Sequence, residues 1–308
     1  MIKGLVRGVR TSSFSSYRTG GPADFFFEAL TLDGLKSVLE WAVSESVPYM
    51  VVGSATNMLF PDAGVRGLVI RNRVSSIENL GGGRLEVAGG TPIRAVSARC
   101  IRDSLGGAEF LTGLPGTVGG AVAGNAGAYG RSMSDLLESA VVFSRDGGLA
   151  EVNRVDMPFS YRSGFPAKSD PETVLLSVVM RLSPEASAAD IKRLMREVMM
   201  PRVERHPSSS LASCGCFFKN PPGEGTDGRR RSAGAILDSC GARGMSCGGA
   251  VVSDMHCNFI VNRGGASSSD ILSLARRMRD MVLEKTGVSL LNEVRIVPEE
   301  PPFVPMDI

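Results

Sequence analysis

Hydrophobic positions in the N-terminal part of the chain switch between strand-like and helical spacing. A Phe-rich run at 24–30 predicts a strand, and Tyr49–Val52 predicts a second one. Between them, apolar residues recur every three or four positions behind Thr31, a residue type that caps helices well. Another apolar run at 68–70 predicts a further strand. This order indicates a βαβ unit, which we place at residues 1–73.

The middle of the chain shows short strands and turns, with two helical patterns. Thr91-Pro92 favours the start of a helix, and its inward positions are Ile93, Val96, Cys100 and Ile101. Apolar spacing at 183–200 predicts a connecting helix that ends at Pro201, because proline removes a helical hydrogen bond. A second lobe is therefore expected at 74–200.

The C-terminal pattern mixes helices and strands. A helix is predicted at 232–241, short strands at about 251 and 259, and then an amphipathic helix that a glycine ends. We expect an α+β domain at 201–297. The remaining segment, 298–308, carries four prolines and is expected to be an extended tail.

Composition and charge exclude several classes of function. Lys plus Arg is 34 and Asp plus Glu is 32, so the net charge of +2 gives no field that would attract nucleic acid. No apolar run approaches the ~18 residues that span a bilayer. The N-terminus lacks the apolar stretch of a signal peptide. We expect a cytoplasmic globular protein with neither membrane nor nucleic acid as a partner.

Glycine is unusually abundant, with 37 residues, and is densest at 113–130. A second loop of small residues, 53–57, directly follows a predicted strand. Glycines let successive backbone N–H groups converge on a pyrophosphate. The alternative is that they only form tight turns. Two such loops favour a dinucleotide, but neither matches the Rossmann or the P-loop pattern.

The cysteines do not have the spacing of a metal site. There are six of them: Cys100, Cys214, Cys216, Cys240, Cys247 and Cys257. A CxC pair with scattered single thiols differs from the paired CxxC spacing of structural zinc sites, so we expect no metal. Most of these thiols are expected to fill the core. Cys216 differs, because it lies between a glycine and a turn that carries Lys219, a setting that favours a lowered thiol pKa.

Two charged residues occur in apolar surroundings. Arg162 lies between aromatic residues and is suited to binding a carboxylate or an enolate oxygen; the alternative is an exposed arginine packed on Tyr161. Glu293 lies in an apolar strand, where a carboxylate is costly without a partner, although alternation could point it to solvent. These residues support a nucleotide-binding enzyme and leave the reaction open.

Over about residues 13–297 the sequence resembles the UDP-N-acetylenolpyruvoylglucosamine reductase family. The matching motifs, in chain order, are Tyr17-Arg18-Thr19-Gly20-Gly21-Pro22-Ala23, residues 53–59, residues 113–130, Tyr161-Arg162-Ser163, residues 215–221, residues 248–262 and Glu293-Val294-Arg295. Each motif is weak alone, but their order and spacing together are specific.

The resemblance implies an α+β fold. Two lobes would form an FAD-binding module of the vanillyl-alcohol-oxidase/PCMH type, and a C-terminal α+β domain would bind substrate. It also implies a flavoenzyme of peptidoglycan synthesis in which NADPH reduces FAD. The flavin then passes hydride to the enolpyruvyl β-carbon of a UDP-sugar, and the enolate is protonated at the α-carbon. The oligomeric state stays open, with a monomer as the working expectation.

The resemblance also implies roles for individual residues. Arg162 and Glu293 would stabilise the enolate, Glu293 as a protonated donor, and Cys216 would supply the proton. Substrate contacts are expected from Tyr161, Lys219 and Asn220. Backbone N–H groups of the two glycine-rich loops would hold the FAD pyrophosphate, at Gly53, Ser54, Ala55, Thr56, Asn57, Gly113, Gly116, Thr117, Gly119, Gly120 and Asn125.

Three departures from the family pattern stand out. The family usually has serine at the position of Cys216. The 53–57 loop places Cβ atoms where the pyrophosphate should pack. No insertion follows Arg162, which favours the shorter branch of the family.

Two alternatives stay open at this point. Another flavin oxidase or dehydrogenase of the same superfamily would share residues 113–130 without needing Glu293. A non-catalytic nucleotide-binding protein would explain the altered 53–57 loop.

Overall fold

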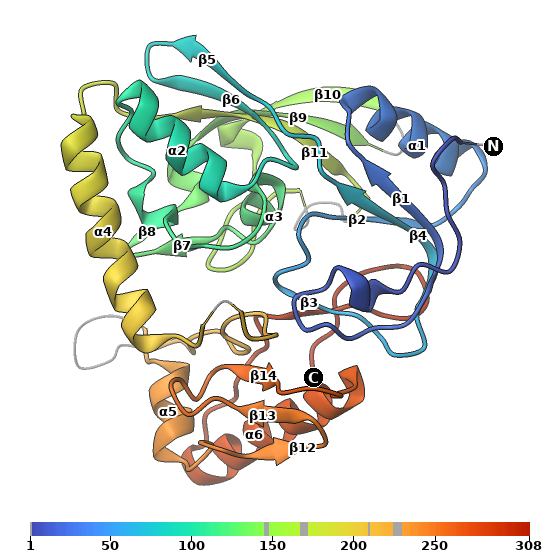
Figure 1. Ribbon diagram of the computed structural model, residues 1–308, viewed down its shortest axis with the longest axis vertical. Helices are drawn as coiled ribbons and strands as arrows, with labels where there is room; N and C mark the ends of the chain where they lie inside the picture. The colour runs from blue at the N-terminus through green and yellow to red at the C-terminus, as the bar shows by residue number, and fades with distance from the viewer. Residues whose placement is uncertain (1, 145–147, 167–171, 209, 224–229) are drawn as a thin grey trace. The chain divides into compact units, whose positions relative to one another are not determined.

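The computed structural model describes residues 2–144, 148–166, 172–208, 210–223 and 230–308 (Figure 1). Contacts divide the chain into two compact units. Unit 1 comprises Met1–Arg7, Phe25–Ser54 and Gly67–Arg202, and unit 2 comprises Gly8–Asp24, Ala55–Arg66 and Val203–Ile308. Both units therefore take segments from the N-terminal third of the sequence.

The first sheet of unit 1 has the predicted order of strand, helix and strand. Strands β1 (Ala23–Ala29), β4 (Val65–Asn72) and β2 (Tyr49–Val52) lie in the order β1-β4-β2, with β2 parallel to β4. Helix α1 (Leu32–Ser44) begins at Thr31, whose side chain caps it. Its apolar stripe is buried, as the spacing predicted. The predicted succession of strand, helix and strand is present, and β4 lies between β1 and β2 in the sheet.

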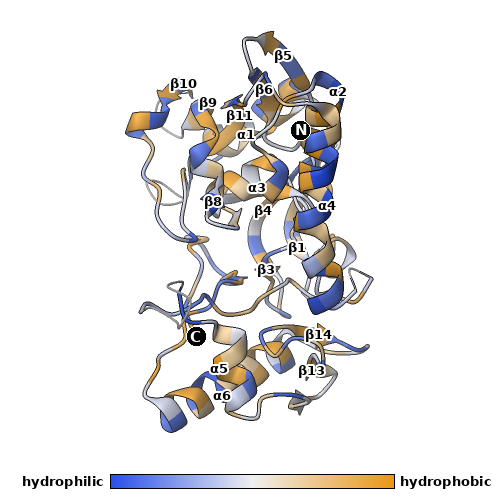
Figure 2. Ribbon diagram, turned by 90° about the vertical axis from the view of Figure 1, so that its left-hand side faces the viewer, coloured by the Kyte–Doolittle hydropathy of each residue, from blue (hydrophilic) through white to orange (hydrophobic). Residues whose placement is uncertain are grey.

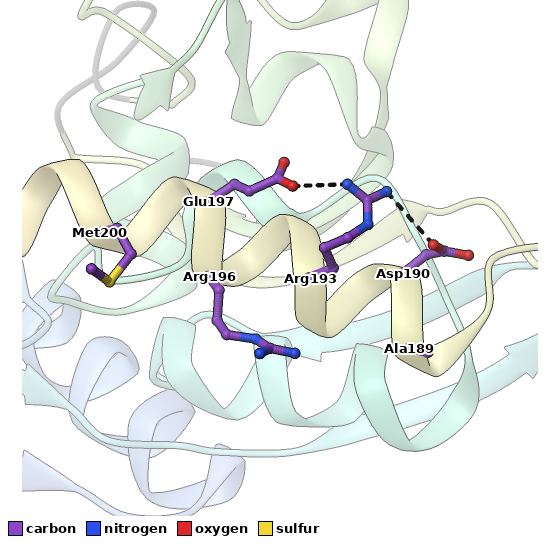
Figure 3. A pocket seen from close by; sticks show the side chains of 6 residues that line it. All are labelled: Ala189, Asp190, Arg193, Arg196, Glu197 and Met200. Carbon is purple, nitrogen blue, oxygen red and sulfur yellow. Dashed lines mark hydrogen bonds and ion pairs between the residues drawn. The ribbon is translucent and has the colours of Figure 1, made fainter.

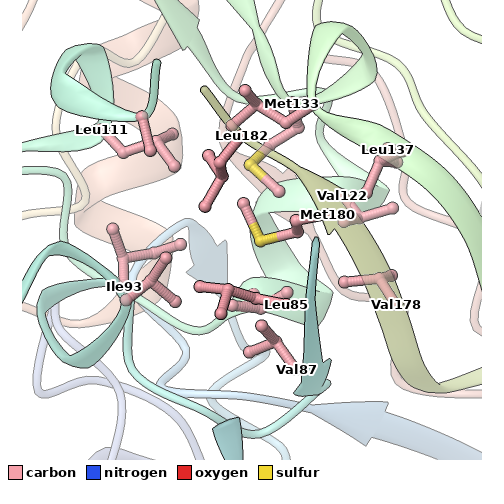
Figure 4. Close-up of a cluster of buried hydrophobic side chains, with 14 of the residues drawn as sticks. Leu85, Val87, Ile93, Leu111, Val122, Met133, Leu137, Val178, Met180 and Leu182 are labelled. Carbon is pink, nitrogen blue, oxygen red and sulfur yellow. The ribbon is translucent and has the colours of Figure 1, made fainter. Parts of the chain in front are cut away.

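A five-stranded antiparallel sheet forms the rest of unit 1, in the order β10-β9-β11-β6-β5. Its strands are β5 (Ile77–Gly81), β6 (Arg84–Ala88), β9 (Leu137–Ser144), β10 (Gly148–Asn153) and β11 (Val174–Arg181). Helices α2 (Ile93–Asp103) and α3 (Val118–Ala123) contribute to its core. Figure 4 shows Leu85, Ile93 and Met180 gathered in this buried cluster.

Short elements of the described chain include the following 3₁₀ helices and two-residue strands: η1 (Thr11–Ser13), β3 (Met58–Leu59), η2 (Glu109–Leu111), β7 (Gly127–Ala128), β8 (Arg131–Ser132), η3 (Met133–Asp135), η4 (Arg154–Asp156) and β15 (Arg295–Ile296). In unit 2, β3 pairs in parallel with β15. In unit 1, β7 pairs with β8.

The connecting helix differs from its prediction at both ends. Helix α4 runs from Ala188 to Arg205 and contains Pro201. Its first turn begins behind Ser187, whose hydroxyl accepts the N–H of Asp190 at 3.0 Å. Proline costs a helix about 3 kcal/mol, but it removes only one backbone bond, and the remaining bonds continue the helix. Figure 2 shows hydrophilic segments along α4, in keeping with its exposed charges.

Unit 2 is an α+β arrangement. Strands β12 (Ser246–Cys247), β13 (Ala250–Val252) and β14 (Ile260–Asn262) form an antiparallel sheet. Helices α5 (Ala233–Ser239) and α6 (Ser268–Thr286) share one apolar core with it. As predicted, a glycine ends α6: Gly287 adopts the left-handed conformation, with φ of 69°.

The proline-rich C-terminal segment returns to unit 2. The N–H of Met306 donates to the carbonyl of Ile296 at 3.0 Å. The Asn292 side chain donates to the carbonyl of Met306 at 3.1 Å and accepts the N–H of Ile308 at 3.4 Å. The segment is thus held by hydrogen bonds. Across the described ranges, no helix is long and apolar enough to cross a membrane.

Asp62 ties the second segment of unit 2 to helix α6, and this contact gives a pH-dependent prediction. Its carboxylate accepts the N–H groups of Ser268 at 2.8 Å and Ser269 at 2.9 Å. Burial acts to raise the pKa of Asp62, but these hydrogen bonds outweigh it and leave the pKa below its usual value. A depressed folded-state pKa stabilises the fold above the unfolded pKa of about 3.9. That stabilisation disappears as pH falls through the folded value.

We predict that Asp62→Asn lowers the free energy of unfolding at pH 7 by about 0.5–1 kcal/mol, since the side chain is exposed and solvent weakens the contact. Urea unfolding at pH 7 and again at strongly acidic pH measures the effect. The difference between variant and parent should vanish at the acidic pH. An equal difference at both values would contradict this account.

Candidate active site

Cys216 lies on a segment of unit 2 that is hydrogen-bonded on both sides. The N–H of Phe217 donates to the carbonyl of Asn258 at 2.7 Å. The carbonyl of Phe217 accepts the N–H of Glu293, also at 2.7 Å. Cys216 itself forms an isolated antiparallel bridge with Phe259. These bonds bring the segments of Cys216 and Glu293 together, although the two residues are far apart in sequence.

Asn258 locks this arrangement from inside the core. Its side chain is 1% exposed, accepts the N–H of Phe218 at 2.9 Å and donates to the carbonyl of Phe218 at 2.8 Å. The sequence signal was its place in the 248–262 motif, but no role was predicted for it. Because both ends of the amide are paired with one residue, Asn258 fixes the register of the segment that carries Cys216.

Lys219 and Asn220, two of the predicted substrate-binding residues, have different surroundings. The backbone N–H of Lys219 donates to the carbonyl of Leu291 at 2.8 Å, which extends the same ladder. The side-chain oxygen of Asn220 accepts the N–H of Ala233 at 3.0 Å, at the first turn of α5. Asn220 therefore has a structural contact, whereas the backbone of Lys219 is fixed and its side chain is partly exposed.

Asn57 belongs to a predicted cofactor loop but contacts the Glu293 segment. Its side-chain amide donates to the carbonyl of Glu293 at 3.1 Å, and its carbonyl accepts the N–H of Arg295 at 3.0 Å. Both contacts lie within unit 2. Glu293 is thus positioned from two directions, by Phe217 and by Asn57.

Ala55 keeps a glycine-like backbone in the same loop. It is buried and has a φ of 50°, in the left-handed region that costs a residue with Cβ about 1–2 kcal/mol. One of the Cβ atoms noted in the sequence is therefore carried on a strained backbone.

Burial distinguishes Cys216 from most of the other thiols. Burial raises the pKa of Cys100 to about 12 and that of Cys214 to about 12. Burial and the carboxylate of Asp238 raise the pKa of Cys257 to about 11. These thiols stay protonated and unreactive. Cys216 is partly exposed, as a proton donor to a bound molecule must be.

In unit 1 the two glycine-rich loops meet at Gly53 and Thr117. A Cβ on Gly53 would lie 2.2 Å from the Thr117 hydroxyl oxygen, so only glycine fits there. A Cβ on Gly119 would lie 3.0 Å from the carbonyl of Gly89. At these two positions the missing side chain allows close packing, whereas a Cβ on exposed Gly120 would meet nothing closer than 3.5 Å.

Hydrogen bonds narrow the set of amides that could hold a pyrophosphate. The N–H groups of Gly119 and Asn125 already donate to the carbonyls of Gly89 and Val122, at 2.8 and 3.0 Å. Within the described part of the chain, the N–H groups of Ser54, Gly116 and Thr117 donate to no protein acceptor. A nest formed by small residues with unpaired amides fits an anionic group such as the FAD pyrophosphate.

Arg162 is held in place within unit 1. Its guanidinium lies 5.5 Å from the Tyr161 ring and donates to the carbonyl of Gly127 at 3.0 Å. Its φ of 55° is a strained backbone conformation that surrounding contacts must maintain. The predicted packing on Tyr161 is present, but Arg162 is half-buried and not freely exposed.

The side chain of Asn125 forms hydrogen bonds with two other segments of unit 1. Its side chain donates to the carbonyl of Ser160 at 3.0 Å and accepts the N–H of Ser134 at 3.1 Å. The predicted residues are thus divided: Arg162, Tyr161 and the 113–125 loop belong to unit 1, whereas Cys216, Lys219 and Glu293 belong to unit 2.

A surface hollow elsewhere does not include the predicted residues. It lies along α4 and is lined by Ala189, Asp190, Arg193, Arg196, Glu197 and Met200 (Figure 3). Arg193 forms ion pairs there with Asp190 and Glu197. Within the described ranges, no three His, Cys, Asp or Glu side chains are grouped as metal ligands.

Two segments of the chain match the profiles of known protein domains. Residues 23–153 match the profile of an FAD binding domain, and residues 206–297 match that of the UDP-N-acetylenolpyruvoylglucosamine reductase C-terminal domain. The predicted fold, an FAD-binding module followed by this C-terminal domain, is confirmed.

Individual relatives cover nearly the whole chain. The UDP-N-acetylenolpyruvoylglucosamine reductase of Gloeobacter violaceus is 37% identical over 294 residues, 95% of this chain and 96% of the relative. That of Clostridioides difficile is 36% identical and covers 92% of this chain and 90% of its own length. The crystal structure of the Thermus caldophilus reductase matches with a TM-score of 0.79 and 34% identity, over 95% of this chain and 99% of that one. The chain belongs to the UDP-N-acetylenolpyruvoylglucosamine reductase family of FAD-dependent oxidoreductases.

Proposed function

We propose that the protein reduces the enolpyruvyl group of UDP-N-acetylglucosamine enolpyruvate to give UDP-N-acetylmuramate for peptidoglycan synthesis, with FAD as bound cofactor and NADPH as reductant. One observation carries this proposal beyond family membership. The ladder through Phe217 holds the segments of Cys216 and Glu293 side by side, so a thiol acid and a carboxyl group share one rigid framework.

We assign FAD to lobes at 1–73 and 74–200, substrate to the domain at 201–297, and no catalytic role to 298–308. The unpaired N–H groups of Ser54, Gly116 and Thr117 support a pyrophosphate site. The other loop residues shape it by packing. We further propose a cytoplasmic monomer that needs no partner besides substrate and NADPH.

When bound and reduced, FAD would supply hydride chemistry for the β-carbon of the substrate, and the N–H groups of Ser54, Gly116 and Thr117 would hold its pyrophosphate. Cys216 then donates the proton from Sγ to the α-carbon. The guanidinium of Arg162 binds the substrate carboxylate and stabilises the charge that develops on it. Glu293 donates a hydrogen bond from a protonated carboxyl group, because a second anion would repel the enolate. Tyr161, Lys219 and Asn220 orient the UDP-sugar.

Two steps under anaerobic conditions test the proposal. NADPH should bleach the flavin absorbance of the purified protein, and the enolpyruvyl UDP-sugar should restore it with formation of the saturated product. Restoration by a simple alcohol-derived carbonyl compound would instead favour another oxidoreductase of the superfamily. A colourless protein that takes up no FAD would favour a non-catalytic binder.

Because Gly53 is in close contact with Thr117, we predict that a side chain at position 53 weakens FAD binding. Gly53→Ala forces the two loops apart, and over-packing of this kind costs about 1–3 kcal/mol, so FAD should bind roughly 10- to 100-fold more weakly. Flavin absorbance of the purified variant during FAD titration measures it. The matched control is Gly124→Ala in the 113–130 segment, where the Cβ would have an ordinary contact of 3.5 Å. Equal flavin affinity in both variants would exclude this role for Gly53.

The proposed acid predicts a selective effect of Cys216→Ala. No substrate proton moves when NADPH reduces FAD, so this half-reaction should stay nearly normal. Substrate reduction should slow by roughly 10²- to 10⁴-fold, as expected when a general acid is lost. Cys216→Ser should keep substantial activity, because serine is the usual family residue. Stopped-flow flavin absorbance separates the halves, and equal slowing of both, or of neither, rejects Cys216 as the acid.

A further inference from the structure

Tyr17 is a completely buried residue of unit 2 whose hydroxyl is poorly satisfied. The side chain is 0% exposed and packs in the core cluster with Cys214, Phe217 and Phe218. Among the described residues, its hydroxyl forms no regular hydrogen bond. A buried polar group without a partner costs roughly 1–3 kcal/mol, whereas phenylalanine would fill the same space at no such cost. The hydroxyl therefore needs an explanation other than packing.

The backbone of Tyr17 is anchored, which fixes the position of the ring. Its carbonyl accepts the side-chain N–H of Asn262 at 2.9 Å. Asn262 in turn donates its own backbone N–H to the carbonyl of Ala212 at 2.9 Å, next to the Cys214-Gly215-Cys216 turn. Tyr17 is thus tied to the chain that leads into the proposed proton donor.

Both thiols of this turn influence the Tyr17 phenol electrostatically. Burial, followed by the charge that Cys214 and Cys216 would carry as thiolates, raises the pKa of Tyr17 well above its usual value, while the backbone amide of Cys214 partly offsets this. Tyr17 accordingly keeps its proton at neutral pH. This influence of the Cys214 amide acts on the oxygen, whereas the O–H hydrogen has no acceptor among the described residues.

Cys216 is the better acceptor of the two sulfurs. The Cys214 thiol is buried, donates to the carbonyl of Met58 at 3.5 Å and has a pKa raised to about 12, so it stays neutral. Gly215 between them has a φ of 78°, a turn that takes the chain from buried Cys214 to partly exposed Cys216. Only at Cys216 does the proposed reaction create negative charge on sulfur.

We propose that Tyr17 is a positioning residue for the proton donor: its hydroxyl donates a hydrogen bond to the Cys216 sulfur and stabilises the thiolate formed during turnover. In that step the S–H bond breaks, its electron pair stays on sulfur, and the proton forms the new C–H bond at the substrate α-carbon. Tyr17 keeps its own proton throughout. This inference rests on the proposed role of Cys216.

Other titratable groups near Cys216 do not replace this contact. His256 packs on the Phe259 ring at 5.0 Å, and burial lowers its pKa, so it carries no positive charge at neutral pH. His206 packs on the same ring at 5.1 Å. The segment of Glu293 is hydrogen-bonded to Phe217, the neighbour of Cys216, and an ionised Glu293 side chain would repel a thiolate at Cys216. Tyr17 offers a neutral O–H donor that would stabilise the sulfur without adding a charge.

Alkylation of Cys216 tests the contact without any catalytic step. Cys216 and Cys247 are the partly exposed cysteines and the other four are buried, so a Cys247→Ser background leaves Cys216 as the accessible thiol. The rate of iodoacetamide alkylation is followed against pH, with mass spectrometry to confirm the site. Tyr17→Phe should raise the pH midpoint by about one unit or more, as expected when a hydrogen bond to a charged group is lost.

Tyr49→Phe is the matched control. Tyr49 is also buried, and its hydroxyl donates to the carbonyl of Glu172 at 2.9 Å within unit 1. This control should leave the midpoint unchanged. In turnover, Tyr17→Phe should slow substrate reduction about tenfold while flavin reduction by NADPH stays normal.

The outcomes separate this inference from the proposed function. An unchanged alkylation midpoint in Tyr17→Phe overturns the inference, even if the variant is less stable. A shifted midpoint supports the contact, and it does so even if Cys216→Ala shows that another group is the acid. A shifted midpoint with normal substrate reduction rejects the positioning role in catalysis.

Discussion

The structure around the proposed active site depends on the backbone of one residue, Phe217. Its N–H is bound by the carbonyl of Asn258 and its carbonyl by the N–H of Glu293, both at 2.7 Å. Cys216 is therefore aligned between two strands, and its direction is set by main-chain bonds rather than by the rotamer of a long side chain. A proton donor needs this order, because proton transfer requires hydrogen-bonding distances that a mobile segment would not maintain. The hydrogen bonds of Asn258 and Asn57, together with the proposed contact of Tyr17, add to this main-chain framework around Cys216.

The cofactor loops illustrate a different constraint, in which glycine serves both packing and ligand approach. Gly53 and Gly119 have no room for a Cβ because protein atoms occupy that space. The missing side chain of Gly53 lets the 53–57 loop approach Thr117 closely. In the part of the chain that the structure describes, the amides of Ser54, Gly116 and Thr117 donate to no protein acceptor. Non-glycine residues with positive φ also occur in these loops, at Ala55 and Asn125, and at the predicted catalytic residue Arg162. Residues held in such conformations are typical of binding and catalytic loops.

The spacing of hydrophobic residues and the chemistry of individual residues predicted many of the helices and strands. Thr31 marked the start of α1 and a glycine marked the end of α6, because caps are local and depend on few neighbours. Pro201 misled the prediction for α4, since helix propensity is a weak prior that the other backbone bonds override.

The interleaving of the chain between two units was not predictable, because it depends on contacts between distant segments. The same holds for the hydrogen bond from the Asn57 side chain to the Glu293 carbonyl, which no sequence pattern indicated. Asn258 was visible only as part of a motif. Its role became clear when both of its hydrogen bonds to Phe218 could be seen. The sequence could therefore indicate candidate residues by their chemical type. Their hydrogen-bond partners could be identified only from the folded structure.

The central claim is that main-chain alignment of Cys216 enables protonation of the substrate. Asn258→Ala tests it most directly, because it removes two hydrogen bonds from the framework and leaves every proposed catalytic side chain in place. The rates of the two half-reactions are measured by stopped-flow flavin absorbance. The account predicts normal reduction of FAD by NADPH, which shows an intact flavin module, and substrate reduction slowed by roughly 10-fold or more, given about 1 kcal/mol per lost bond. Normal rates in both halves would contradict it.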